Sequence, residues 1–163
     1  SVLAGWEAGN GIAYIARRPN VANNFLGWEE NAEANLVPYR FFVTDSIADA
    51  ENILEDYGVR YIVAGEPILS GNFAMMLDVL GLPHNAHFDR QADGNFAPKP
   101  KLFNTMALRL YLHDAQHMSH FRLVHESPDK HLVAGTLMSR TKVFLFDKSL
   151  FLPADTPSPS PQN

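Results

Sequence analysis

Three histidines in the second half of the chain have the spacing of metal ligands on a helix. His113, His117 and His120 are four and three residues apart, so a helix through all three would place their imidazoles on one face. Such a face could bind zinc. A helix that ends near Leu112 would instead leave them as polar residues beside a helix end, where the helix dipole favours histidine. Both interpretations stay open; the sequence favours the second, and we expect no metal ligands in this chain.

A glycine pair near the N-terminus matches only part of a nucleotide-binding loop. Gly9-Asn-Gly11 begins as such a loop does, but Tyr14 stands where a small residue must let helix and strand approach closely. The sequence contains no Walker loop, no Gly-x-Ser-x-Gly elbow and no His-Glu-x-x-His pair. We therefore expect no cofactor in this chain.

The composition is that of one globular domain. Its 163 residues are 46% hydrophobic and 19% charged. A net charge of -5 without a basic block argues against nucleic acid as a partner. The absence of cysteine excludes disulfide and thiolate chemistry. No stretch approaches the roughly 18 apolar residues of a membrane span. The chain opens at Ser1 rather than methionine, so we expect a fragment of a longer protein.

The hydrophobic periodicity predicts an α/β domain with a mixed sheet and packed helices. Ser46, with Asp49 three residues on, is typical of a helix start, and Gly58 is a natural stop. A predicted strand on each side of this helix suggests a parallel pair joined by a right-handed crossover. The predicted strands are residues 40–44, 59–64, 120–126, 132–137 and 141–147; the predicted helices lie within 2–18, 46–58, 73–80 and 102–112.

Two further segments are predicted to lack regular structure. Residues 84–101 are rich in His, Asn, Asp, Gly and Pro and are predicted to form a long loop. Residues 153–163 are rich in Pro and Ser and are predicted to form an extended tail, separate from a domain at 1–152.

The N-terminal run VLAGWEAGNGIAYIARRPNVANNF, residues 2–25, resembles the signature segment of oligosaccharyltransferase catalytic subunits, especially the archaeal form. That signature reads Trp-Trp-Asp-Tyr-Gly and precedes a short apolar helix, a basic pair with proline and a turn like Val-Ala-Asn-Asn-Phe. Further similarity follows in order at residues 56–63, 108–111, 121–127 and 142–146. The resemblance therefore extends over about residues 1–150.

The resemblance implies a soluble C-terminal domain of a polytopic membrane enzyme that faces the periplasm or cell exterior. Such an enzyme transfers a lipid-linked oligosaccharide onto the Asn of an Asn-x-Ser/Thr acceptor polypeptide. Its membrane part, absent here, would hold the lipid and a divalent cation, Mg or Mn, on acidic ligands. This chain would therefore contain no catalytic residue and would bind the acceptor polypeptide.

Matched to the signature, Gly5 stands for the first Trp, Trp6 for the second, Glu7 for Asp, Ala8 for Tyr and Gly9 for Gly. In the family this segment holds the Ser or Thr hydroxyl. A carboxylate accepts a hydrogen bond from this hydroxyl, and indole N–H groups donate hydrogen bonds to its oxygen. Glu7 keeps the acid but moves it by about one C–C bond, and errors of about 1 Å are costly in such sites. The missing Trp and Tyr also open the pocket.

A second motif of the family, a kinked helix beside the hydroxyl pocket, is similar in position to residues 71–76. Asn72 stands where archaeal members often have Lys, and Met76 could supply an apolar contact. Met75 and Met76 are nevertheless more typical of a core than of a pocket, and Arg17 and Arg18 are expected to face solvent.

Three functions remain compatible with these residues. The first is acceptor recognition for N-glycosylation. The second is a related membrane glycosyltransferase that uses a different acceptor, and the third is a non-catalytic domain that binds a partner protein. The second and third are compatible with Trp6 as an ordinary core residue and Glu7 as a solvated carboxylate near a helix N-terminus.

Overall fold

The computed structural model describes residues 1–5, 12–13, 15–22, 32–66, 72–92, 94–133 and 135–149. The predicted tail at 153–163 lies outside this part of the chain. None of the described helices is long and apolar enough to cross a membrane. The elements, in chain order, are β1 Val2–Leu3, α2 Ala32–Val43, α3 Ile47–Asp56, β2 Tyr61–Gly65, α4 Asn72–Val79, η3 His84–Ala86, β3 Phe88–Arg90, β4 Phe96–Pro98, α5 Pro100–Phe103, α6 Met106–His113, β5 Phe121–Glu126, β6 Lys130–Val133, β7 Thr136–Ser139 and β8 Thr141–Phe146.

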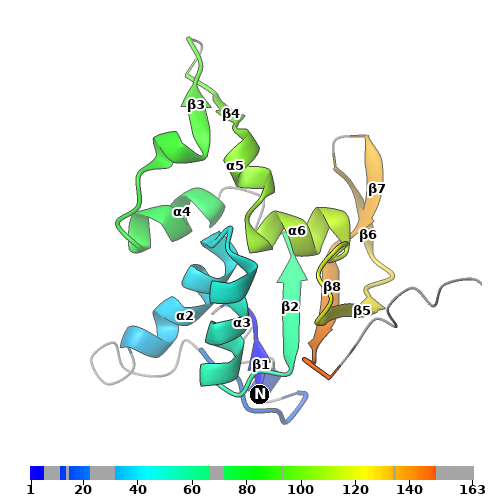
Figure 1. Cartoon of the computed structure of the whole chain (residues 1–163). Helices are drawn as coiled ribbons and strands as arrows, with labels where there is room; N and C mark the ends of the chain where they lie inside the picture. Colours follow the sequence, from blue (N-terminus) through cyan, green and yellow to red (C-terminus); the bar gives the residue numbers. More distant parts are fainter. Residues whose placement is uncertain are drawn as a thin grey trace, which may run out of the picture.

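A four-stranded mixed sheet organises the domain, which confirms the predicted fold class (Figure 1). Its order is β1-β2-β8-β5, with β1 parallel to β2 and the other neighbours antiparallel. The register aligns Leu3 with Ile62 and Ile62 with Phe144, and all three side chains are fully buried. Because alternate residues of a strand point to one face, this row forms the sheet's contribution to the core.

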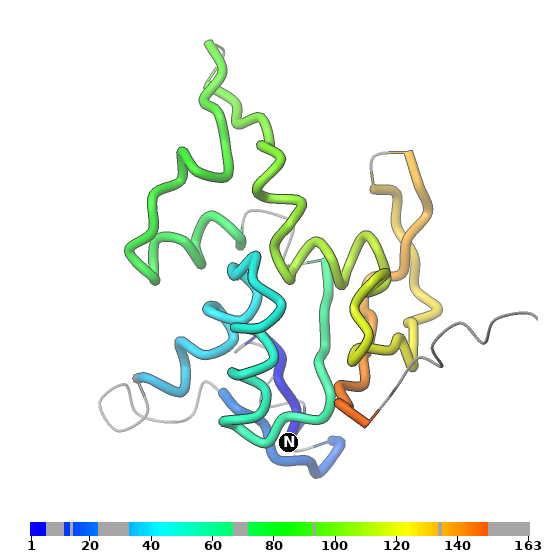
Figure 2. The backbone as a smooth tube through the Cα atoms, viewed as in Figure 1, coloured from blue at the N-terminus to red at the C-terminus, as the bar shows by residue number. Residues whose placement is uncertain are grey.

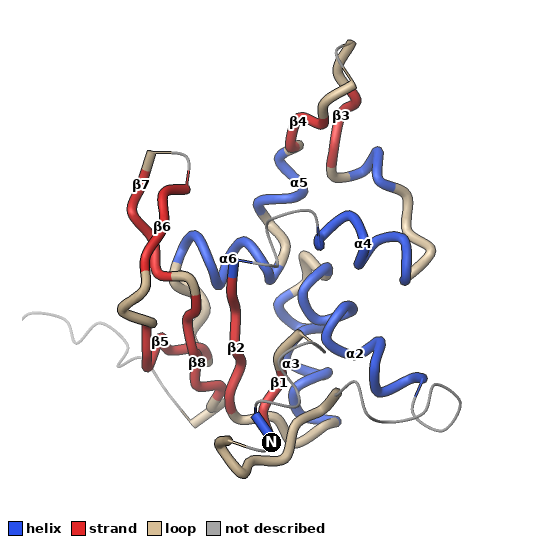
Figure 3. The backbone as a smooth tube through the Cα atoms, turned by 180° about the vertical axis from the view of Figure 1, so that it is seen from behind, coloured by secondary structure: helices blue, strands red, loops and turns tan. Residues whose placement is uncertain are grey.

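Helices cover the core face of the sheet (Figures 1 and 3). The helix α2 packs against α3, α4 and α6, and α6 lies against β2. The start of α3 is as predicted, because the Ser46 side chain accepts a hydrogen bond from the Asp49 amide at 3.1 Å. After this helix Gly58 adopts a φ of +56°, a conformation that glycine tolerates.

The strand predicted at residues 40–44 is wrong, because residues 40–43 are the last turn of α2. A short apolar run does not distinguish a buried strand from a buried helix. Here Val37 and Phe41, one turn apart, are both buried, and Arg40 pairs with Glu33 two turns earlier. The predicted parallel pair is therefore also wrong, since the parallel partner of β2 is β1.

The N-terminal residues form a strand where a helix was predicted within residues 2–18. Val2–Leu3 is β1, while helical backbone is present at Ile12 and Ala13. A strand this short has too few residues to show an alternating pattern, so its sequence carries no signal for the sheet. Arg17 and Arg18 are exposed, as predicted.

Two small hairpins also correct the sequence-based prediction (Figure 2). Residues 84–101, predicted as a loop, contain η3 and the β3–β4 hairpin, in which Phe88 and Phe96 make an edge-to-face contact at 6.2 Å. Residues 132–137, predicted as one strand, turn back at Gly135, with φ +86°, to form the β6–β7 hairpin. The predicted helix 102–112 is divided into α5 and α6 at Thr105, whose hydroxyl donates to the Leu102 carbonyl at 2.7 Å.

A buried lysine joins α6 to the sheet. The Lys142 side chain on β8 is only 4% exposed, and its ammonium pairs with Asp114 and, at 3.7 Å, with Glu126. The same ammonium lies 5.6 Å from the centre of the Tyr111 ring. A buried charge requires such partners, because an uncompensated ion in the interior is strongly unfavourable.

Removing both carboxylates should therefore destabilise the fold. The Asp114→Asn variant keeps a residue that tolerates the left-handed backbone at this position, and we expect a loss of about 1.5–3 kcal/mol. The double variant with Glu126→Gln leaves the ammonium unpaired and should lose about 3–5 kcal/mol in urea unfolding. As a control, Asp89→Asn, which breaks the exposed pair with Lys99, should cost at most about 1 kcal/mol. Equal losses in the double variant and the control would contradict this account.

A second buried ionisable group is His87, which is 4% exposed and meets Phe73 edge-to-face at 5.5 Å. Burial lowers the pKa of His87 below its ordinary 6.5; nearby Lys101 and His84 act in the same direction, and Asp45 opposes them. The imidazole is therefore neutral in the folded protein at pH 7.

Stability should fall as the pH drops below about 6.5, because the unfolded chain then binds a proton that folded His87 resists until its lower pKa is reached. We expect His87→Phe, which keeps the ring contact, to flatten this part of the pH profile in thermal unfolding. His113→Phe, at an exposed histidine, serves as the control and should leave the profile unchanged. An unaltered profile in His87→Phe would contradict the assignment.

Candidate functional site

The carboxyl ends of β1 and β2 lie at one edge of the sheet, because the two strands are parallel (Figure 1). Strand β1 ends at Leu3, and Gly5, two residues further on, is buried; the chain leaves β2 at Glu66. The Glu66 amide is fixed by a 2.9 Å hydrogen bond to the Arg140 carbonyl. In open α/β sheets ligands bind beyond the carboxyl ends of strands, so this edge is the candidate site.

Of the residues predicted from the signature, the structure places the first. Gly5 lies at the carboxyl edge, and Trp6, Glu7, Ala8 and Gly9 lie outside the described residues. The positions of the Trp6 indole and the Glu7 carboxylate therefore stay predictions.

The second predicted motif forms α4, which begins six residues after Glu66. Asn72 is its first residue and is half-buried, whereas Met76, one turn later, is 3% exposed and belongs to the core. The expectation of a core position is thus confirmed for Met76 and wrong for Met75, which is 38% exposed. A spacing of four residues puts Asn72 and Met76 on one face of α4, with Asn72 at the N-terminal end of the helix.

A polar network surrounds the end of β2, and it was not predicted from the sequence. The Glu66 carboxylate pairs with Arg140 and lies 3.5 Å from Nε2 of His131. Arg140 also contacts Asp129 at 3.0 Å. These residues come from β2 and from the β6–β7 hairpin, up to 74 positions apart in the sequence. No local pattern marks such a cluster, because the pairing of strands alone brings its members together.

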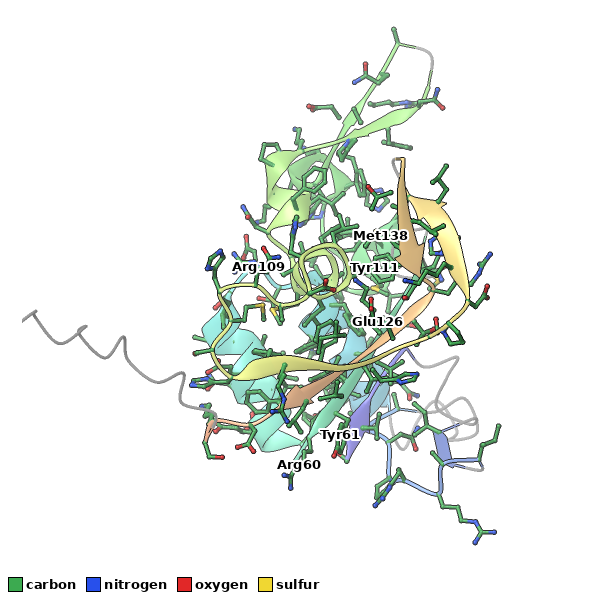
Figure 4. The ribbon with its side chains drawn as sticks, turned by 90° about the vertical axis from the view of Figure 1, so that its right-hand side faces the viewer. Arg60, Tyr61, Arg109, Tyr111, Glu126 and Met138 are labelled. Carbon is green, nitrogen blue, oxygen red and sulfur yellow. The ribbon has the colours of Figure 1, made fainter. Side chains whose placement is uncertain are left out.

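Tyr111 anchors this network beneath the hairpin. Its hydroxyl donates to the Ser139 carbonyl at 2.9 Å, so Nε2–H of His131 is the donor in their 3.2 Å contact. Burial raises the pKa of Tyr111, and the nearby Glu66 carboxylate raises it further. Figure 4 shows Tyr111, Met138 and Glu126 on one side of α6 and Arg109 on the other. The hairpin is thereby held to α6 by a neutral phenol.

Arg60 and Tyr61 lie at the opposite end of β2, where the strand begins (Figure 4). Tyr61 is 42% exposed, and Arg60 is 4.0 Å from Asp147. Polar groups gather at this end as well, since Lys148 pairs with Glu51 and Glu55, and Glu51 also contacts His120. The carboxyl edge is the preferred candidate because Gly5, the first residue of the signature, follows β1 there.

The three central histidines do not share a helix face. Helix α6 ends at His113, after which Asp114 and His117 both have left-handed backbone conformations. His120 is bound through Nδ1 to Glu51 at 2.7 Å. The helical zinc arrangement is therefore wrong, and within the described residues no three His, Asp or Glu side chains are grouped to hold a metal.

Comparisons with known proteins point to one family. The family model of the AglB core domain matches residues 1–68. A dolichyl-phosphooligosaccharide-protein glycotransferase of Archaeoglobus fulgidus is 30% identical over 135 residues, which cover 79% of this chain and 21% of the relative. The chain thus spans about a fifth of the length of that relative.

Solved structures show the same fold. The crystal structure of the C-terminal globular domain of an A. fulgidus oligosaccharyltransferase aligns with 90% of this chain and 80% of its own, at TM-score 0.67 and 23% identity. An A. fulgidus oligosaccharyltransferase tethered to an acceptor peptide with an NVT sequon aligns over 89% of this chain and 27% of its own, at TM-score 0.68 and 17% identity. The same relative in complex with Zn and sulfate gives TM-score 0.69 at 17% identity, with 89% and 29% covered.

Removing the Tyr111 hydroxyl should loosen the hairpin beside the candidate site. Tyr111→Phe keeps the ring but leaves the Ser139 carbonyl and His131 without their partner, and we expect a loss of about 1–3 kcal/mol. Amide exchange should accelerate in Lys130–Val133 more than in Tyr61–Gly65. Tyr57→Phe, at an exposed tyrosine, is the control. Equal acceleration in both strands would show that the bond does not act locally.

Proposed function

We propose, from its similarity in sequence and fold to the C-terminal globular domain of archaeal oligosaccharyltransferases, that this chain recognises the acceptor polypeptide for a membrane oligosaccharyltransferase. The resemblance inferred from the sequence is confirmed by the family model and by the relatives. The observation that supports the proposal is the parallel pairing of β1 and β2, because the carboxyl ends of both strands then lie at one edge of the sheet and the signature begins two residues after β1.

At that edge the signature would hold the Ser or Thr hydroxyl of an Asn-x-Ser/Thr segment. The Glu7 carboxylate would accept a hydrogen bond from the hydroxyl, and the Trp6 indole N–H would donate one to the hydroxyl oxygen. Gly5, two residues after β1, and Asn72, the half-buried first residue of α4, would border this site. Ala8 and Gly9 would supply backbone rather than a ring, and Met76 would support α4 from the core.

The membrane portion of the full protein would perform the transfer of a lipid-linked oligosaccharide to Asn. One solved relative is in complex with an inhibitory peptide and a dolichol-phosphate, and another is in complex with Zn and sulfate. By analogy, a divalent cation, Mg or Mn in this proposal, would be bound outside the chain described here. The domain would face the periplasm or cell exterior, where acceptor polypeptides arrive.

The residues that differ from the family signature could change which acceptor the domain prefers, so the acceptor has to be tested directly. Gly5 and Ala8 remove two aromatic walls, so a weaker or different acceptor preference is a specific alternative. A site built around a hydroxyl discriminates strongly against substrates that lack it, because its own polar groups would be left unpaired.

Titration with an Asn-x-Thr peptide should shift the amide NMR signals of Gly5 and Asn72, and an Asn-x-Ala peptide should not. Glu7→Gln replaces a charged acceptor by a neutral one and should weaken binding at least about tenfold, because a hydrogen bond to a charged group is worth about 1.5–3 kcal/mol. Glu55→Gln, at an exposed pair with Lys148 at the far end of α3, is the matched control.

Weak affinity can be separated from absence of binding by cross-linking, since the chain contains no cysteine. An Asn72→Cys variant should form a disulfide with a cysteine-bearing Asn-x-Thr peptide faster than an Asn85→Cys variant at an exposed position beyond α4. Equal rates, together with equal shifts from the Thr and Ala peptides, would contradict sequon recognition and favour another acceptor or a protein partner.

A further inference from the structure

A pocket of about 440 Å³ lies at the end of α4 that is remote from the candidate site. Leu80 lies in it and Asn72 lies eight residues earlier, about 12 Å along a helix axis. The pocket is also bounded by the end of α2, the segment before α3 and the residues around η3. Its lining residues are Arg40, Val43, Thr44, Asp45, Leu80, Leu82, Pro83, Ala86, His87 and Lys101.

The walls have the composition of a small-molecule site. Val43, Leu80, Leu82, Pro83 and Ala86 provide an apolar surface. A volume of a few hundred Å³ with mostly apolar walls and few polar groups is typical of ligand pockets. An apolar body of a few carbon atoms would therefore fit against this side.

The unusual polar group of the pocket is His87. The side chain is 96% buried, and neither ring nitrogen has a hydrogen-bond partner within the described residues. A neutral imidazole carries one N–H donor, and leaving a buried donor unpaired is unfavourable. Most buried side-chain polar groups in proteins are paired, so this histidine points to a polar group supplied by a ligand.

The charged residues that line the pocket indicate the class of ligand that it can bind. Lys101 and Arg40 contribute two cations, and Asp45 contributes one carboxylate. Arg40 is already paired with Glu33, whereas Lys101 lies 3.7 Å from Asp45 and both side chains are about half exposed. A pair of this distance and exposure is weak, so Lys101 can turn to an incoming anion at little cost.

We propose that this pocket binds a small carboxylate with a short apolar chain. Its carboxylate lies between the Lys101 ammonium and the His87 N–H, and its carbon chain lies along Leu80 and Leu82. The carboxylate is either a free molecule or the side chain of an acidic residue in a bound polypeptide. The site is independent of the sequon proposal, because it shares none of the residues 5–9 or Asn72.

Butyrate is the probe for this site, and the imidazole signals of His87 in a long-range ¹H–¹⁵N spectrum are the readout. We expect saturable shifts with a dissociation constant on the order of 1–10 mM, typical of a six-atom ligand. Bound butyrate should also raise the pKa of His87, because a nearby anion favours the charged imidazole. Butyramide, which has the same shape and no charge, should bind at least about tenfold more weakly.

Two variants separate this site from general anion binding. Lys101→Met keeps most of the apolar side chain and removes its charge, and should weaken butyrate binding at least about tenfold while leaving the remaining amide spectrum unchanged. Lys130→Met, at an exposed lysine on β6, should leave binding unaltered. N-acetylglutamate methylamide tests the peptide-borne source: binding tighter than butyrate would assign the site to an acidic side chain, and weaker binding to a free carboxylate.

The proposal would be overturned by equal shifts from butyrate and butyramide, by tighter binding of butylammonium, or by no response of His87 to any of them. Because the readout is at His87, these outcomes are independent of any response at Gly5 or Asn72 to an acceptor peptide.

Discussion

The pairing of the first residues of the chain with β2 is the constraint on which the candidate site depends. Strand β1 is held on both sides: Ser1 accepts a 2.9 Å hydrogen bond from the Arg60 amide, and Val2 exchanges bonds of 2.8 and 3.0 Å with Pro19 and Val21. Leu3 then enters the core row, where it is fully buried. Because both backbone edges of β1 and the Leu3 side chain are fixed, the position of Gly5, two residues further on, is constrained as well.

The polar groups at the same edge stabilise the end of β2 and the hairpin beside it. Glu66, Arg140 and His131 form contacts that join the strand to the β6–β7 hairpin, and Tyr111 attaches the hairpin to α6. A network of this kind is favourable when its members are satisfied, and it specifies one arrangement of the elements. These contacts therefore involve residues far from the signature in the sequence.

The two ends of α4 have different chemical characters. Its first residue is the half-buried Asn72, and its C-terminal end leads to a pocket lined by a buried imidazole and a lysine. Met76 lies between them in the core and fixes the helix against its neighbours.

The sequence by itself determined the family resemblance, the α/β class, the capped helix α3 and the strands β2, β5 and β8, because each depends on local spacing or on ordered motifs. The sequence did not distinguish a strand from a helix at residues 40–43, because a short apolar run has no clear periodicity. It also did not predict β1, because a strand of two residues is too short to show an alternating pattern. The tertiary structure alone decided that β1 rather than residues 40–44 pairs with β2, and that Glu66, Arg140, His131 and Tyr111 meet. The reason is physical: these contacts join residues far apart in the chain, and only the burial of Leu3, Ile62 and Phe144 in one row brings them together.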